Sequence, residues 1–242
     1  MVAHTSTSTL ALSEADKATI SAAIAAAEAQ TSGEILCVVA RASGDYRATS
    51  LILAIVLALL VPIVALLIGV TPIDLAIHWH RLMGGGWSLG LGSSARDEAA
   101  LGLALVAAAQ TLIVIVVSAL GTMGGLGPTL TPKSYKRQCV HRDALHQFLA
   151  QGIHVTDNRT GVLIYVSLAE HMAEIIADTA IYTKVERGVW SDAIAAVLKG
   201  ARAGDLTRGL TEAIALSGHV LAQHFPREAN DTNELPDRVL LL

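Results

Sequence analysis

The sequence has few charged residues and few aromatic residues. Charged residues make up 16% of the 242 positions and aromatic residues 4%, whereas soluble domains usually carry about 25% charged residues. Apolar residues make up 52%, and the mean hydropathy is +0.52. A chain with this balance is expected to place part of its length in lipid.

Basic clusters, paired cysteines and the pattern of a cleavable leader are also not apparent in the sequence. The formal net charge is −4, and the sequence contains no cluster of Lys and Arg residues, so a nucleic-acid partner is not expected. Cys37 and Cys139 show neither a CxxC nor a zinc spacing, which predicts free thiols. Residues 1–12 lack a basic and apolar leader pattern, so we expect no cleavable signal and a disordered N-terminus.

The common catalytic and phosphate-binding motifs do not occur either. The sequence lacks GxGxxG, GxxxxGK[ST], HExxH, DxD and an EF-hand loop. His78 and His80 form an HxH pair without a third ligand nearby, which is more typical of surface histidines than of a metal site. The residues by themselves therefore predict no metal site and leave the catalytic residues unknown.

Two long apolar segments occupy the middle of the chain. Residues 51–70 carry no charge, and at about 1.5 Å per residue they can cross a hydrocarbon core of about 30 Å. Residues 99–120 are similar, with Gln110 as the only strongly polar side chain, which could bond to the first segment. We expect transmembrane helices at 50–70 and 99–120, joined by a loop or interfacial segment at 71–98.

The segments before and after the two apolar helices have the patterns of a soluble domain. Before the helices, residues 13–49 predict a helix capped by Ser13 and Asp16 and a buried strand at 34–40. After them, residues 133–225 predict a helix at 135–152, strands at 162–168 and 172–178, and two final helices. Ser191 and Asp205 are the expected caps of those two helices. Residues 226–242 are the expected C-terminal tail, whose polar part, residues 226–237, is expected to be irregular.

This order of helices and strands is typical of one layered α/β domain with a short mixed sheet. The stretches TSGEILCVVA, RTGVLIYVSLAEHMAEIIAD and ARAGDLTRGLTEAI, with SYKR and NELPDR, resemble the TPM-domain family, in particular a bacterial membrane-protein branch with two transmembrane helices inserted in the domain. The resemblance covers about residues 13–225. It implies an α/β/α sandwich interrupted by a transmembrane helical hairpin.

The same resemblance suggests several activities. Some relatives are reported as acid phosphatases or calcium binders, and others as assembly or auxiliary factors of membrane complexes. The cofactor stays open, with a divalent cation such as calcium as one possibility. No acidic cluster in this sequence allows a metal site to be carried over residue by residue.

The membrane topology follows if the strands before and after the two apolar segments belong to one sheet. Both flanking segments must then lie on one side of the membrane, which requires an even number of crossings, and two helices meet this requirement. The basic residues near the helices favour a cytoplasmic domain on a multi-pass plasma (inner) membrane protein, although family relatives often lie outside the cytoplasm. On the domain flanks these residues are Arg41, Arg47, Lys133, Lys136, Arg137 and Arg142; in the intervening segment they are Arg81 and Arg96.

One edge of the sheet is the candidate ligand site. If the first two strands are parallel, Ser43 and Asp45 after the first strand approach Glu170 and His171 in the next strand connection. The alternative is that all four are ordinary turn and hairpin residues. We expect Asp178 to be a solvent-exposed residue at the end of a strand.

The function expected from these observations is an interaction or auxiliary (assembly) module for a membrane-protein partner. The alternative is a membrane-tethered, metal-dependent phosphatase, which rests on the resemblance alone. A transport role is not favoured, because the apolar segments bury no ionisable residue.

Overall fold

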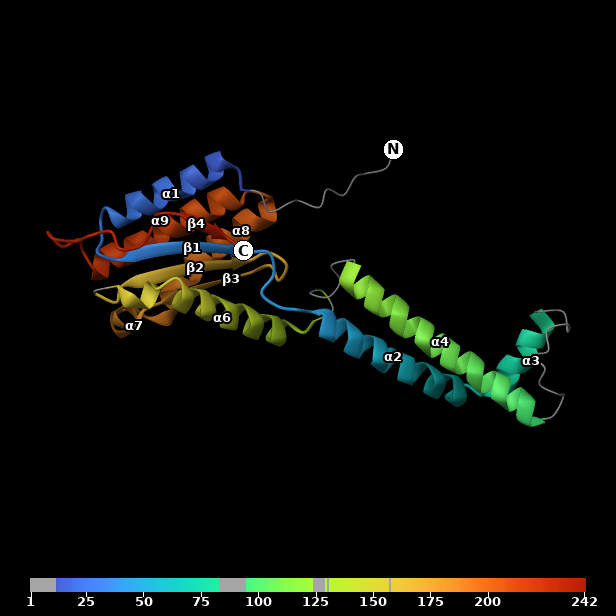
Figure 1. Cartoon of the computed structure of the whole chain (residues 1–242). Helices are drawn as coiled ribbons and strands as arrows, with labels where there is room; N and C mark the ends of the chain where they lie inside the picture. The colour runs from blue at the N-terminus through green and yellow to red at the C-terminus, as the bar shows by residue number, and fades with distance from the viewer. Residues whose placement is uncertain (1–11, 83–94, 124–128, 130, 157) are drawn as a thin grey trace. The chain divides into compact units, whose positions relative to one another are not determined.

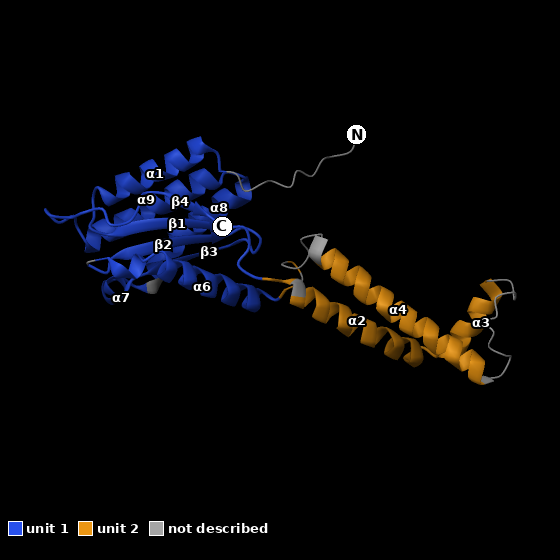
Figure 2. Ribbon diagram, viewed as in Figure 1, with its two compact units in different colours: residues 1–44, 132–242 blue, residues 45–131 orange. Residues whose placement is uncertain are grey.

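The chain consists of two compact units in this computed structural model, which describes residues 12–82, 95–123, 129, 131–156 and 158–242. Unit 1 combines Met1–Gly44 with Pro132–Leu242, and unit 2 is the intervening Asp45–Thr131 (Figure 2). Residues 1–11, where we expected disorder, lie outside the described part.

Unit 1 is built on a four-stranded mixed sheet in the order β3-β2-β1-β4. The strands are β1 (Glu34–Ala40), β2 (Gly161–Ser167), β3 (Met172–Ala177) and β4 (Val239–Leu241). β1 runs parallel to β2 and to β4, whereas β2 and β3 form an antiparallel hairpin. The predicted α/β fold with a short mixed sheet is confirmed, as is the parallel pairing of the first two strands.

Helices cover both faces of this sheet, as Figure 1 shows. Side chains of α1 (Glu14–Glu28), α8 (Ser191–Ala203) and α9 (Leu206–His224) form one apolar core with alternate residues of β1 and β2. α6 (Lys133–Ala150) forms the second core with the residues that face the other way. All seven residues of β1 are buried, which explains why its sequence is a continuous apolar run rather than an alternating one.

The helix ends agree with the sequence in part. Ser13 and Asp16 form the predicted capping box, and the Asp205 side chain caps α9. The predicted cap at Ser191 is wrong, because the short 3₁₀ helix η2 (Arg187–Trp190) leads directly into α8, whose first residue is Ser191. Asp178 is no solvated strand end: it is buried and caps α7 (Thr179–Lys184).

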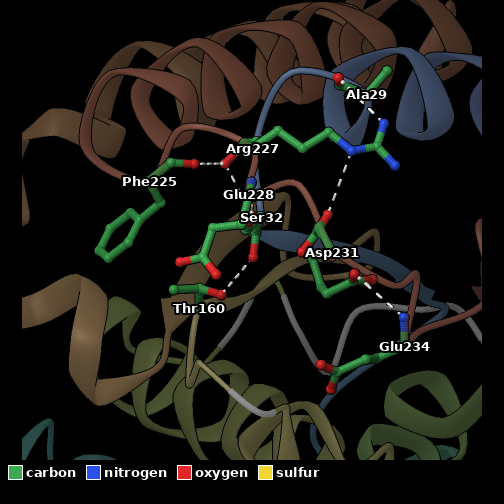
Figure 3. Close-up of polar contacts among 11 residues, drawn as sticks. Ala29, Ser32, Thr160, Phe225, Arg227, Glu228, Asp231 and Glu234 are labelled. Atoms are coloured by element: carbon green, nitrogen blue, oxygen red, sulfur yellow. Dashed lines mark hydrogen bonds and ion pairs between the residues drawn. The ribbon is translucent and has the colours of Figure 1, made fainter.

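The C-terminal tail ends in a strand that we did not predict from the sequence. It is tied to the start of β1 by polar contacts (Figure 3), including Ser32 N to Phe225 O at 3.1 Å and Glu228 N to Ser32 Oγ at 2.9 Å. Its last residues then form β4 along the free edge of β1. The physical reason is that β1 would otherwise expose its unpaired backbone groups.

Unit 2 contains the two long apolar helices and one shorter helix. α2 (Arg47–Leu67) and α4 (Ala95–Met123) include stretches long and apolar enough to cross a membrane, Ala48–Leu67 and Arg96–Gly121. They pack through small residues, since a Cβ on Gly121 would lie 2.2 Å from Ser50 Oγ. The predicted bond of Gln110 is also present, with Nε2 at 3.0 Å from the Ala58 carbonyl oxygen.

The segment 71–98, which we expected to be a loop or an interfacial segment, contains a helix. Pro72–Leu82 forms helix α3. Thr71 and Asp74 cap it reciprocally, with Thr71 N donating to Asp74 Oδ2 at 2.8 Å and Asp74 N to Thr71 Oγ1 at 3.3 Å. Residues 83–94 of the predicted loop lie outside the described ranges.

Candidate functional site

The carboxyl ends of β1 and β2 meet the β2–β3 turn at one edge of the sheet, as the parallel pairing requires. The Leu168 and Ala169 amides donate to the carbonyl oxygens of Ala40 and Arg41, at 3.0 and 2.9 Å. This continues the β1–β2 ladder beyond the strands and holds the turn beside the chain that follows β1.

Glu170 joins the two segments at this edge. Its side chain is buried, with 3% of the residue exposed. Oε1 accepts a hydrogen bond from the Ser43 amide at 3.0 Å, and Oε2 accepts one from the Ser167 hydroxyl. A carboxylate that accepts two hydrogen bonds in a buried position is a strong connection between β1 and the turn.

Three hydroxyl groups extend this connection to α6. Ser43 Oγ donates to Ser167 Oγ at 2.7 Å and lies 2.8 Å from the Tyr165 hydroxyl, which donates to the Asp143 carboxylate. Burial, followed by the bond to Asp143, raises the pKa of Tyr165, so its hydroxyl keeps its proton at neutral pH. We call Asp143, Tyr165, Ser43, Ser167 and Glu170 the edge network.

The edge network has fewer hydrogens than contacts. Its three hydroxyls supply three hydrogens, whereas four contacts link the five side chains in a row. With both end carboxylates ionised, one contact therefore lacks a hydrogen.

Two of the four predicted site residues are in direct contact within unit 1. These are Ser43 and Glu170. His171 is exposed in the turn with a φ of 53°, which fits its alternative interpretation as a hairpin residue. Asp45 is exposed and is the first residue of unit 2.

Sequence reasoning missed three members of the edge network. Tyr165 and Ser167 are two residues apart in β2, so they share the face that α6 covers, and a buried tyrosine hydroxyl generally needs a partner. That alternation was a usable signal. Asp143 had none, because its position over Tyr165 depends on how α6 lies across the sheet.

The edge network is better suited to holding segments together than to catalysis. Tyr165, Ser167 and Glu170 are each at most 3% exposed, so these three groups are shielded from a substrate, whereas Ser43 and Asp143 are partly exposed. In the described ranges, no three His, Cys, Asp or Glu residues are grouped so that they could hold a metal ion.

A second polar cluster lies at the opposite end of β1 and secures the tail. Glu28 Oε1 accepts from the Ile35 amide at 2.7 Å, and the Glu34 carboxylate accepts from the Leu235 amide at 3.1 Å. Burial, with repulsion from Glu34 and Asp237, raises the pKa of Glu28 to about 9. Glu28 is therefore a neutral acid at physiological pH.

Comparisons with known proteins agree with this fold. No protein-family model and no curated protein matches the sequence. The NMR structure of BA42 protein from the psychrophilic bacterium Bizionia argentinensis is similar, with a TM-score of 0.52 and 17% sequence identity over 96% of this chain and 95% of that chain. At this identity the likeness shows the fold alone.

Proposed function

We propose that the protein is a membrane-anchored interaction module of the TPM-domain type. In this proposal α2 and α4 cross the membrane as a hairpin and hold the α/β domain on its cytoplasmic face, where the domain serves membrane partners as an auxiliary or assembly factor. The observation that carries the proposal is the parallel pairing of β1 with β2, from Glu34 beside Gly161 to Ala40 beside Ser167. Because unit 2 is inserted between these strands, both of its ends must lie on the same side of any membrane it crosses.

The apolar surface of unit 2 supports the membrane anchor. Ile52 is 62% exposed, Leu59 59% and Ile115 59%, and most of the apolar surface of α2 and α4 is uncovered within the chain. A core helix of a soluble protein would bury such residues. Lipid tails or the helices of a partner would cover them here.

The edge network supports an anchoring role over an enzymatic one. It ties Ser43, the second-last residue before unit 2, to α6, the first helix of unit 1 after unit 2. It thus fixes the two chain segments through which the domain is attached to the hairpin. For the alternative, a metal-dependent phosphatase, the described residues contain no group of three His, Cys, Asp or Glu side chains that could hold a metal ion.

Two experiments on the full chain test this function. After carbonate washing, the protein is expected to stay in the membrane fraction and to float with vesicles, and release by carbonate would contradict the anchor. A photo-crosslinking residue at Tyr182, which is 44% exposed on unit 1, is expected to yield discrete protein adducts in intact membranes, whereas lipid adducts alone would contradict the interaction role. Hydrolysis of a phosphate ester that requires Mg²⁺ or Ca²⁺ and is lost in Glu170→Gln would favour the phosphatase instead.

A further inference from the structure

β3 is one edge of the sheet, and part of its outer side is unpaired. The Asp178 amide, just after β3, donates to β2 at 2.9 Å, and backbone groups alternate in direction along an antiparallel strand, so those of Ala173 and Ile175 point away from β2. In the same outward row, the Ala177 amide donates to the Tyr182 hydroxyl at 3.4 Å. Within the described residues no hydrogen bond reaches the outward groups of Ala173 and Ile175. Their amides and carbonyl oxygens are therefore available to an added strand.

A groove of about 430 Å³ lies at this edge, between α6 and α8. The two helices pack on opposite faces of the sheet, so they form two walls with β3 between them. The α6 wall presents Val140 with the polar side chains of Arg137 and His141, and the α8 wall presents Ile194 and Leu198. One wall of the groove is therefore apolar and the other carries charge.

Arg137 gives the charged wall its preference. Glu174 of β3 also lines the groove, but it pairs with His141, whereas no ion pair in the described part of the chain involves the exposed Arg137. Arg137 precedes His141 by four residues of α6, so it lies about 6 Å along the helix from that pair. Side chains on one face of a strand are separated by a similar distance. A carboxylate on an added strand can therefore meet Arg137 one same-face position away from Glu174.

We propose that this groove binds an extended segment of a partner protein, which adds as a strand beside β3 and places an acidic side chain on Arg137. Main-chain hydrogen bonds to Ala173 and Ile175 would hold the segment. Its side chains would alternate between the walls, with apolar residues toward Ile194 and Leu198 and polar residues toward α6. This inference rests on the interaction role proposed above, and it names the site and the chemistry of the partner.

A second copy of this chain fits the edge less well. One antiparallel register pairs both Ala173 and Ile175 with the same two residues of a second copy, and this register puts Glu174 directly opposite its counterpart. Like charges directly opposite each other in a sheet are destabilising. The same-face neighbours of Glu174 in β3 are apolar, so this pairing also brings no carboxylate to Arg137. The groove therefore favours a different chain.

The test uses the full chain in detergent micelles and a synthetic peptide with blocked ends, in which Val and Thr alternate and one central Thr is replaced by Glu. We expect saturable binding that slows the hydrogen exchange of the Ala173 and Ile175 amides, measured by NMR. The same peptide with Lys in place of Glu is expected to bind about fivefold more weakly, because it loses the ion pair with Arg137. Arg137→Gln should remove this preference. Arg142→Gln, on the same helix but outside the groove, should keep it.

Methylated peptides test whether the segment binds as a strand. Only one edge of an added strand faces β3, and alternate residues of the peptide direct their amides to that edge. Methylating the amide nitrogens of one alternate set, either the Val residues or the others, should therefore abolish binding, while methylating the other set should leave it. Equal effects of the two sets, or binding without protection of Ala173 and Ile175, would overturn the inference.

The remaining outcomes separate this inference from the proposed function. If neither peptide binds, but the chain still floats with vesicles and forms protein adducts through Tyr182, the groove is overturned as the site and the interaction role stands. Lipid adducts alone at Tyr182 would instead contradict the interaction role. Protection of Ala173 and Ile175 that increases with protein concentration in the absence of peptide would assign the edge to a second copy and also overturn the inference.

Discussion

Glu170→Ala is expected to destabilise unit 1 by about 2–4 kcal/mol. The substitution removes a buried carboxylate and leaves two donors, the part-buried Ser43 amide and the buried Ser167 hydroxyl, without their acceptor. Each orphaned buried donor costs about 1–3 kcal/mol. The substitution also disconnects the turn from the segment that leads into unit 2, so the loss should be concentrated where β1 and β2 end.

Hydrogen exchange measured by mass spectrometry, on the full chain in detergent, separates unit 1 from the helices of unit 2. A loss of about 3 kcal/mol corresponds to an exchange rate of the β1 and β2 amides about 150 times faster, if exchange follows opening of the sheet. Glu174→Ala is the matched control, because Glu174 in β3 pairs with His141 at the surface and such pairs contribute about 0–1 kcal/mol. Equal effects of the two substitutions, or an effect of Glu170→Ala below about 1 kcal/mol, would refute the reasoning.

Three further predictions address the other cluster and the helix contacts. Between pH 4.5, the ordinary pKa of a Glu side chain, and about 9, the raised pKa of Glu28, the folded protein keeps the Glu28 proton and the unfolded chain does not. The free energy of unfolding should therefore fall as the pH rises through this window, by at most about 1.4 kcal/mol per pH unit. Denaturant titrations across this window should show a flatter dependence in Glu28→Gln, and identical slopes would contradict this. Gly200→Ala places a Cβ 2.6 Å from the α9 backbone and should cost about 1–3 kcal/mol in thermal unfolding, whereas Gly188→Ala, whose Cβ meets nothing within 4 Å, should be close to neutral. Gln110→Leu removes the bond to Ala58 and should weaken the α2–α4 pair by about 1 kcal/mol in detergent unfolding; no change would show that this bond is dispensable.

The parts of the fold that the sequence predicted are those set by local patterns. β1 is a short apolar run between turn-forming residues, and all its residues are buried on both faces of the sheet. The strand could therefore be recognised from its sequence. The capping box at Ser13 and the cap at Asp205 are local hydrogen bonds between residues three apart. The two long apolar helices could be predicted from the length and composition of their sequences alone.

The parts that were missed depend on contacts distant in sequence. β4 has three residues, and its extended form follows from its pairing with β1, two hundred residues away. α3 was missed for a different reason. Its capping box of Thr71 and Asp74 is a local pattern in the sequence, but the polar composition of the segment favoured a loop. In the candidate site, strand direction alone predicted that Ser43 and Glu170 meet, whereas Asp143 joins them only through the packing of α6.

The most direct test of the account is the membrane sidedness of three engineered cysteines, introduced one at a time. Glu14→Cys precedes unit 2, Arg81→Cys lies between α2 and α4, and Arg202→Cys follows unit 2, and all three native residues are exposed. Cys37 and Cys139 are buried, so they leave a quiet background for an impermeant maleimide.

The account predicts that Glu14→Cys and Arg202→Cys label only after the cells are permeabilised, and that Arg81→Cys labels in intact cells. Labelling of the first two from opposite sides would contradict a hairpin inserted in one domain. Labelling of all three from the same side would contradict a membrane crossing altogether.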